Sequence, residues 1–320
     1  MKILYIHNAE FQDPNLEKLD TTLLQVVSMS QAFAKSKNKV FLALPKVKIA
    51  HQILQKMFAD ILRAKPAFKI YYYSSRFPFK LKKHFEVFSI LSIINKIKPD
   101  IIYIRNPAFL YLLWLTKSSI IFESHNYLLH SRLKLLDCYY KKILLFSTMK
   151  KNFIKLVTIS ENLANYWWKE GIVKSKILAY HDGFNFSFFR KPLSKWDVRQ
   201  HLGIPPEETV VMYTGGFYEN REIENIIELA KQFNYLSFYL IGGPKDQRIK
   251  FCKKAKLIGA ENIKFLDKKK YFEIPAYLFA ADILLALWSS KVKTINYCSP
   301  LKLFEYMASG KLIIAHDFPT

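Results

Sequence analysis

Short apolar runs of strand length alternate with longer helical patterns along nearly the whole chain. In the first half this pattern predicts strands at residues 2–7, 39–44, 68–73, 100–104, 118–123 and 155–159. Helices are expected between them at residues 21–36, 51–64 and 84–96. Such alternation is typical of a parallel sheet that is covered by helices on both faces. In sheets of this kind, ligands bind beyond the carboxyl ends of the strands.

A second series of alternating elements begins near residue 209. Strands are expected at residues 209–213, 236–241, 262–266, 281–287 and 312–315, with helices at 223–233 and 271–280. A chain of 320 residues accommodates two domains of ordinary size. We therefore predict an α/β protein with two Rossmann-like parallel-sheet domains, at residues 1–185 and 207–320. Residues 186–206 are expected to link them and to contain a small helix at 195–202.

The charge is strongly unbalanced, because 49 Lys and Arg residues face 26 Asp and Glu residues, giving a net charge of +23. Nucleic acid, an anionic membrane surface and anionic substrates are all compatible with such a charge, and so is a simple lysine-rich bias. Residues 76–85 and 149–155 interleave cations with apolar side chains. This pattern suits a bilayer surface or single-stranded nucleic acid, and equally a solvated face with partly buried aromatic residues.

The cysteines and the N-terminal residues favour a cytoplasmic protein. Cys138, Cys252 and Cys298 are widely spaced and lack the spacing of a zinc site, so we expect reduced thiols. The chain passes directly into the strand at 2–7, which is too short for the core of a signal peptide. No apolar stretch is long enough to span a bilayer.

The loop after the first strand contains no glycine at residues 8–15. A dinucleotide-binding domain places G-x-G-x-x-G there, because glycines let the backbone approach a pyrophosphate. The sequence therefore argues against an NAD- or FAD-dependent oxidoreductase.

The most informative motif is the run from Ser299 to Gly310, which reads as an abruptly started helix leading into a buried strand. Ser299 is a candidate N-cap and Pro300 suits the first helical position. Lys302 and Glu305 fall on one helical face together with Tyr306 and Ser309. A helix N-terminus beside a lysine suits a phosphate, and a glutamate can accept two hydrogen bonds from a ribose diol. The alternative is an amphipathic helix with a solvated polar face.

This run, S-P-L-K-L-F-E-Y-M-A-S-G-K, resembles the donor-site motif of the family-4 glycosyltransferases, which are retaining enzymes of the GT-B fold. The resemblance implies two domains facing a cleft, with the acceptor side on the first domain. It implies that Glu305 holds the ribose of a nucleoside-diphosphate sugar. The backbone that approaches the diphosphate and sugar belongs to Ser299, Pro300, Leu301, Lys302 and Leu303. Tyr297 replaces a glutamate that many members carry, so the identity of the sugar stays open.

Four further segments carry the resemblance. Y-T-G-G-F-Y-E-N-R matches the segment that grips the diphosphate, which assigns Gly215, Gly216 and Arg221 to donor binding, although Glu222 replaces a customary glycine. The loop at Asp267 and Lys268 corresponds to the place where members meet the base. The segment 177–185 resembles the end of the first domain, and 157–163 a strand followed by an N-cap at Ser160.

A histidine after the fifth expected strand is the candidate catalytic residue. His125 lies in the sequence Glu123-Ser124-His125-Asn126, where family members place a histidine that faces the donor sugar. A lone histidine at a strand end is otherwise more often structural.

The resemblance implies a hexosyl-type glycosyltransferase that acts on a glycan or lipid-linked acceptor in cell-surface polysaccharide or glycolipid synthesis, with retention. It implies no bound metal, and the chain has no Asp-x-Asp pair. Contact with the inner face of the membrane is expected, and nucleic acid is not favoured. The family's second domain continues past the last expected strand, so we expect this domain to be incomplete. The alternatives are a nucleotide-sugar epimerase and a non-catalytic basic protein that binds membrane or nucleic acid.

Overall fold

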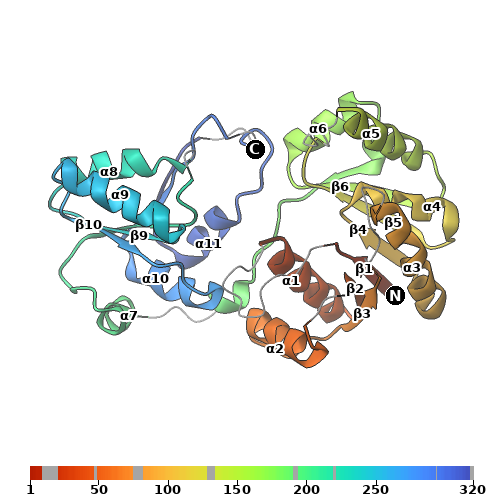
Figure 1. Ribbon diagram of the computed structural model, residues 1–320, viewed down its shortest axis with the longest axis horizontal. Coiled ribbons are helices and arrows are strands. Elements are labelled where there is room, and N and C mark those ends of the chain that lie inside the picture. The colour runs from red at the N-terminus through yellow and green to blue at the C-terminus, as the bar shows by residue number, and fades with distance from the viewer. Residues whose placement is uncertain are drawn as a thin grey trace. The chain divides into compact units, whose positions relative to one another are not determined.

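The computed structural model describes residues 1–8, 21–46, 49–74, 82–127, 134–189, 194–218, 221–292 and 294–317. These residues form two compact units (Figure 1). Unit 1 comprises Met1–Gly183 together with Tyr297–Ser299, and unit 2 comprises Phe184–Asn296 and the chain from Pro300 onward. Residues 186–206, expected as a linker, fall in unit 2. Most of the glycine-free loop at 8–15 and residues 76–81 lie outside the described residues.

Unit 1 contains a seven-stranded sheet in which all neighbouring strands are parallel. Its strands are β1 (Lys2–Ile6), β2 (Lys39–Pro45), β3 (Lys69–Tyr73), β4 (Ile101–Ile104), β5 (Ser119–Ser124), β6 (Phe153–Thr158) and β7 (Ile177–Ala179). The spatial order is β3-β2-β1-β4-β5-β6-β7. The central strand β1 is buried from Ile3 to Ile6, which explains why it reads as a continuous apolar run.

Helices cover both faces of this sheet. They are α1 (Thr21–Lys35), α2 (His51–Leu62), α3 (Lys82–Ile97), α4 (Leu112–Leu115), α5 (Lys134–Thr148) and α6 (Glu161–Lys169), with 3-10 turns η1 (Pro107–Tyr111) and η2 (Lys174–Lys176). One core joins alternate strand residues such as Leu4 and Ile102 to Ile94 of α3, Leu144 of α5 and Trp167 of α6. On the other face α1 packs against α2 and β2. The sequence analysis did not predict α5.

Unit 2 contains a five-stranded parallel sheet in the order β10-β9-β8-β11-β12. Its strands are β8 (Val210–Thr214), β9 (Ser237–Ile241), β10 (Ile263–Leu266), β11 (Ile283–Ala286) and β12 (Leu312–Ala315). Its helices are α7 (Lys195–Leu202), α8 (Ile223–Gln232), α9 (Lys245–Leu257), α10 (Ile274–Ala280) and α11 (Leu301–Ser309), with 3-10 turns η3 (Phe186–Phe188) and η5 (Tyr271–Glu273). Helices α7, α10 and α11 join one core, and α8 and α9 join the other.

The prediction of a buried last strand was wrong. In β12, Leu312 is 63% exposed and Ile314 is 48% exposed. The strand lies at the edge of the sheet, and no described helix follows it to cover its faces. Helix α9 was not predicted, because its six lysine and arginine side chains obscure the apolar positions Phe251 and Ala255 that it buries.

In both sheets the order in which the chain adds strands reverses at a central strand, and this reversal determines where polar groups gather. The chain winds outward from β1 to β2 and β3, and then crosses to β4 on the other side. The same reversal occurs in unit 2 between β8 and β11. Crevices form outside the carboxyl ends of the strands at such points.

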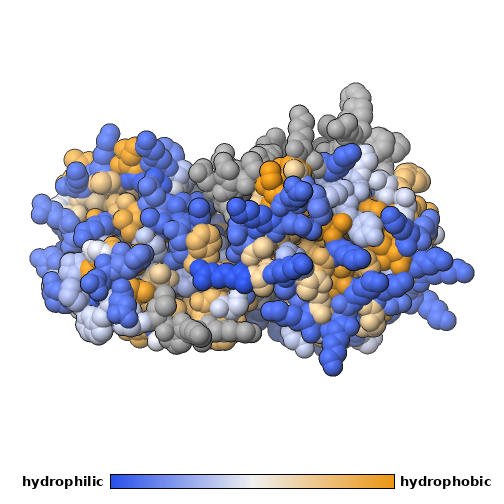
Figure 2. Space-filling model, turned by 90° about the horizontal axis from the view of Figure 1, so that it is seen from below, coloured by the Kyte–Doolittle hydropathy of each residue, from blue (hydrophilic) through white to orange (hydrophobic). Residues whose placement is uncertain are grey.

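Hydrophilic side chains dominate the face shown in Figure 2, where apolar residues form separate patches. Among the described residues no helix is long and apolar enough to cross a membrane.

Candidate functional site

The predicted donor-site residues of unit 2 lie around the carboxyl ends of β8 and β11. Helix α11 is fixed there by Tyr306, whose buried hydroxyl accepts a hydrogen bond of 2.9 Å from the backbone N–H of Thr214, the last residue of β8. Lys302, on the same helix, is thereby held next to Gly215. The expected helical face of the motif therefore does point inward rather than into solvent.

The Lys302 ammonium is the most unusual group of the site. Its Nζ atom is buried, and among the described residues it has no hydrogen-bond partner. It lies 3.8 Å from the centroid of the Tyr213 ring and 5.4 Å from that of Trp288. Burial and the nearby charge of Arg221 hold the pKa of Lys302 well below its usual range, and Glu305 opposes this shift. A buried cation of this kind is stabilised strongly by an anion.

Gly215 makes room for this lysine. Its φ angle is +142°, and a Cβ atom at this position would lie 2.8 Å from Nζ of Lys302. The φ angle favours glycine, and a larger residue would also have to displace the end of the Lys302 side chain. Gly216, the other predicted glycine, instead lies against the ring of Tyr218.

Arg221 supplies a second cation at the same place. Its guanidinium carbon lies 5.9 Å from the centroid of the Trp288 ring, so Arg221 and Lys302 share one aromatic neighbour. The next residue, Glu222, adopts a φ of +54°, which is unfavourable for a residue with a side chain. This conformation explains why a glycine is customary at that position in the family that the motif resembles.

Glu305 provides the acceptor groups of the site. Burial raises the pKa of this carboxyl to about 7, although the hydroxyl of Tyr271 and the charge of Lys302 oppose the shift. Tyr271 comes from η5, so groups from two elements influence the pKa of this carboxyl. Glu305 thus changes its charge near neutral pH.

The role predicted for Ser299 as helix N-cap was wrong. The N-cap of α11 is Pro300, and no side chain caps the helix. The Ser299 hydroxyl instead accepts a hydrogen bond of 2.7 Å from the backbone N–H of Asp182, within unit 1. Leu301 and Leu303 are half-buried, and Leu303 packs against the core of unit 2. By contrast, Ser160 caps α6 as predicted, accepting from the N–H of Leu163 at 3.3 Å.

Asp267 and Lys268 begin the loop that leads from β10 to Tyr271. They follow β10, which is separated from β8 by β9. Asp267 is 75% exposed and forms an ion pair with Arg248. Tyr271, three residues after Lys268, brings the same loop to Glu305.

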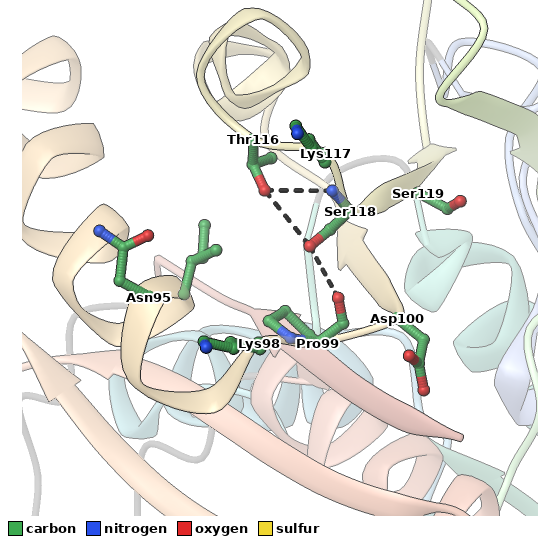
Figure 3. Close-up of a pocket in the computed structure, with 9 residues that line it drawn as sticks. Asn95, Lys98, Pro99, Asp100, Thr116, Lys117, Ser118 and Ser119 are labelled. Carbon is green, nitrogen blue, oxygen red and sulfur yellow. Dashed lines mark hydrogen bonds between the residues drawn. The ribbon is translucent and has the colours of Figure 1, made fainter.

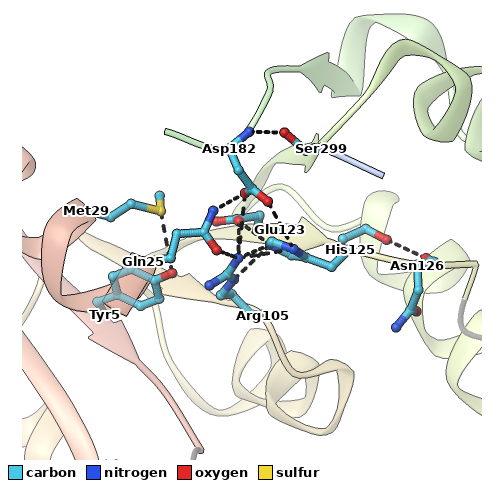
Figure 4. Close-up of polar contacts among 10 residues, drawn as sticks. Tyr5, Gln25, Met29, Arg105, Glu123, His125, Asn126, Asp182 and Ser299 are labelled. Carbon is cyan, nitrogen blue, oxygen red and sulfur yellow. Dashed lines mark hydrogen bonds and ion pairs between the residues drawn. The ribbon is translucent and has the colours of Figure 1, made fainter. Parts of the chain in front are cut away.

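His125 belongs to a separate polar cluster at the carboxyl ends of the strands of unit 1 (Figure 4). Arg105 follows β4, Glu123 lies near the end of β5, and Asp182 follows β7. The buried Arg105 guanidinium lies 2.9 Å from Oε1 of Glu123 and donates from Nε to Nε2 of His125 at 2.9 Å. It also donates to the side-chain oxygen of Gln25 at 2.6 Å. His125 is the most exposed of the ionisable members, at 27%.

The charges of this cluster are mutually dependent. Burial alone would raise the pKa of Glu123, but Arg105 and His125 lower it to about 2. The pKa of Asp182 is raised, chiefly by burial, and its Oδ2 lies 3.9 Å from Nδ1 of His125. The cluster therefore holds one ionised carboxylate and one carboxylate whose protonation is easier than usual.

Glu123, His125 and Asp182 also have the ligand types of a divalent-cation site, since one atom from each lies within 4.8 Å of the others. Arg105 interacts with all three of these side chains (Figure 4). Because the guanidinium already supplies the positive charge, the arrangement suits an ion-pair network better than a metal. Independence from metals stays a prediction.

A pocket of unit 1 lies at the opposite ends of the same strands (Figure 3). It is lined by residues before β4 and β5, including Pro99 and Ser118. Ser118 donates to the carbonyl of Pro99 at 2.7 Å, and Thr116 accepts from the N–H of Ser118 at 3.1 Å. These polar groups form hydrogen bonds with one another, so we interpret the pocket as a structural feature of the fold and not as a ligand site.

Sequence reasoning missed the aromatic residues Tyr213, Trp288 and Tyr271, and the partners of His125. A signal was present for Arg105, because a charged residue directly after a buried strand lies in the ligand zone. The aromatic residues gave no comparable signal, since they fit equally well in a core.

Comparisons with known proteins relate the chain to glycosyltransferases. Residues 194–320 match the family described as "Glycosyl transferases group 1". The putative colanic acid biosynthesis glycosyl transferase WcaI of Escherichia coli (strain K12) is 26% identical over 163 residues, which are 50% of this chain and 39% of WcaI. The matched segment thus spans well under half of that relative.

Solved structures with similar folds cover almost the whole chain. Anabaena HepE in complex with UDP and glucose has a TM-score of 0.70 at 15% identity, covering 98% of this chain and 80% of HepE. A glycosyltransferase from Rickettsia africae has the same score and identity, covering 98% and 78%. The UDP-GlcNAc 2-epimerase from Neisseria meningitidis scores 0.58 at 13% identity, covering 89% and 77%. At these identities the likeness shows the fold, and it confirms the predicted α/β class with two Rossmann-like domains of GT-B type.

Proposed function

We propose that this chain is a glycosyltransferase that moves a sugar from a nucleoside-diphosphate sugar to a glycan or a lipid-linked acceptor, in the synthesis of a cell-surface polysaccharide or glycolipid. The observation that carries the proposal is the buried Lys302 ammonium, which has Arg221 beside it and no hydrogen-bond partner among the described residues. Two cations at the carboxyl ends of β8 and β11 call for an anion with more than one negative charge, and a diphosphate is such an anion.

The chemistry assigned to unit 2 is recognition and leaving-group stabilisation. Lys302 and Arg221 bind the diphosphate, on which negative charge develops as the bond between sugar and phosphate breaks. Arg221 offers paired donors to phosphate oxygens, and Lys302 acts as a compact charge. Glu305 accepts hydrogen bonds from the ribose hydroxyls. These proposed roles do not require a bound metal ion.

Unit 1 is assigned the acceptor side. We place His125 at the reacting sugar, as the motif resemblance implies, with Arg105 as a positioning residue that donates to its Nε2. Retention of configuration, a hexosyl donor and a cytoplasmic, membrane-associated location belong to the same proposal. HepE has been solved with UDP and with UDP-glucose, so UDP-sugars are the first donors to test.

The test compares nucleotide binding by the purified chain and by a Lys302→Gln variant. Binding of UDP, GDP and ADP is measured by thermal shift and by calorimetry. A nucleotide that binds the native state raises the melting temperature. Loss of a charge-assisted contact weakens binding by about 10- to 100-fold. Lys253→Gln, an exposed lysine of α9, is the matched control and leaves the affinity unchanged.

The alternatives give different results. An epimerase consumes a UDP-sugar in the absence of an acceptor, and it transfers no sugar to an acceptor when one is added. A non-catalytic basic protein binds none of the nucleotides in a folded sample. Equal affinities of wild type and Lys302→Gln would remove the diphosphate contact from the proposal.

A further inference from the structure

A stripe of exposed side chains runs along one side of α5 in unit 1. Its positions are spaced alternately four and three residues apart and comprise Leu135, Tyr139, Lys142, Phe146 and Met149, the last directly after the helix. Leu135 is 87% exposed, Phe146 63% and Met149 81%. Residues at this spacing lie on one side of a helix, and at 1.5 Å per residue the stripe is about 20 Å long.

Helix α4 extends this stripe sideways. Trp114 and Leu115, at its end, are 46% and 49% exposed. The hydroxyl of Tyr111 in η1 contacts that of Tyr139, and the Lys150 ammonium lies 5.1 Å from the centroid of the Trp114 ring. Figure 1 shows α4 and α5 in the same unit. We call the apolar set the α4–α5 surface, which consists of Trp114, Leu115, Leu135, Tyr139, Phe146 and Met149.

Cations outnumber carboxylates around this surface, where the partly exposed Glu170 is paired with Lys141 of α5. Lys117, Lys142 and Lys151 are exposed nearby, and Lys150 covers Trp114. Within the described residues 112–127 and 134–152, the acidic side chains are Glu123 and Asp137, and both are buried. The region therefore presents a positive potential around an apolar centre.

We propose that the α4–α5 surface docks unit 1 onto an anionic lipid bilayer. Leucine, phenylalanine and methionine side chains on one side of a helix enter the boundary between headgroups and acyl chains, and tryptophan and tyrosine favour the same depth. The lysines bind the anionic headgroups. The inference rests on the membrane-associated location of the proposed function and names the surface responsible, which lies in unit 1, whereas the residues that bind the nucleotide lie in unit 2.

Two other occupants fit less well. A second copy of the chain, packed through the same stripe about a twofold axis, would bring two sets of lysines together, and like charges oppose such pairing. Single-stranded nucleic acid binds through bases stacked on aromatic rings. Leu135 and Met149 are the most exposed members of the surface and offer no ring for stacking.

The test is co-sedimentation of the full chain with vesicles of phosphatidylcholine, alone or with roughly one third phosphatidylglycerol. We expect binding to the anionic vesicles that weakens as salt is added. A Phe146→Ser, Met149→Ser double variant loses two inserting side chains, so its partition coefficient falls by about tenfold or more. Tyr235→Ser with Leu257→Ser, 74% and 87% exposed in unit 2, is the matched control and binds as the wild type does.

Several outcomes would overturn the proposal. One is equal binding of the wild type to both kinds of vesicle. Another is a double variant that melts at the same temperature as the wild type and binds the anionic vesicles equally well. If the double variant melts lower, Leu135→Ser replaces it, because this side chain makes little contact with the fold. A dimer, or a complex with a single-stranded oligonucleotide, that the variant loses while vesicle binding persists would assign the surface to that partner. The UDP thermal shift, recorded on the same samples, reports separately on the donor site.

Discussion

The Lys302 ammonium lies 3.8 Å from the centroid of the Tyr213 ring, and the charge of Glu305 also favours its protonated form. A cation over an aromatic face is stabilised by about 2 kcal/mol when it is desolvated, which is less than the loss of its hydration. Loss of the proton, which the depressed pKa favours, or the binding of an anion relieves this cost.

Nucleotide binding is expected to take up a proton at mildly alkaline pH. The pKa of Lys302 is depressed in the free protein, and a diphosphate beside it raises this pKa. Glu305, with a pKa of about 7, is already ionised there. Calorimetry of UDP binding in buffers with different ionisation enthalpies measures the uptake. Lys302→Gln abolishes it; an unchanged uptake in this variant would assign the proton to another group.

A Gly215→Ala variant is expected to lose both stability and nucleotide affinity. The φ of +142° is strained for alanine, and the new Cβ displaces the ammonium of Lys302. Strain alone lowers the free energy of unfolding by about 1–3 kcal/mol. Gly171→Ala provides the control, because Gly171 has a φ of +107° but nothing within 4 Å of the added atom. Thermal melting and UDP titration of both variants separate strain from displacement, and equal UDP affinities would contradict the steric role.

An Arg199→Met variant is expected to destabilise unit 2 by about 3–5 kcal/mol. The Arg199 side chain is 1% exposed, lies 2.6 Å from Oδ2 of Asp282, and donates to three backbone carbonyls. Its removal leaves these acceptors buried without their partner. Arg248→Met removes an arginine paired with the exposed Asp267, so it changes stability by at most about 1 kcal/mol. Urea unfolding of both variants measures the difference, and similar losses would argue against a structural role for Arg199.

Acid is expected to destabilise unit 1 through Glu123. Its pKa of about 2 lies below the value of 4.5 in the unfolded chain, so its contribution to stability is present above pH 4.5 and is lost between pH 4.5 and 2. The shift corresponds to about 3 kcal/mol. Glu123→Gln removes this part of the pH dependence, whereas Glu161→Gln, at an exposed position of α6, retains it. Unfolding followed at a series of pH values gives the result; parallel profiles for wild type and Glu123→Gln would refute the assignment.

Local patterns in the sequence determined most of the secondary structure and the class of the fold. The apolar runs that became β1, β4 and β8 are buried on both faces, so burial shows directly in their composition. The predicted small helix at residues 195–202 appears as α7, and Gly310 ends α11 with a φ of +67°. Each of these features depends on residues that are neighbours along the chain.

Features that depend on distant contacts required the tertiary structure. Ser299 reads as an N-cap, but the approach of Asp182 gives its hydroxyl another partner. The run at β12 reads as buried, but its edge position leaves Leu312 exposed. The sequence by itself determined that Lys302 and Glu305 share a helical face. Only the tertiary structure decided that this face turns inward, because the hydrogen bond between Tyr306 and Thr214 joins residues 92 positions apart.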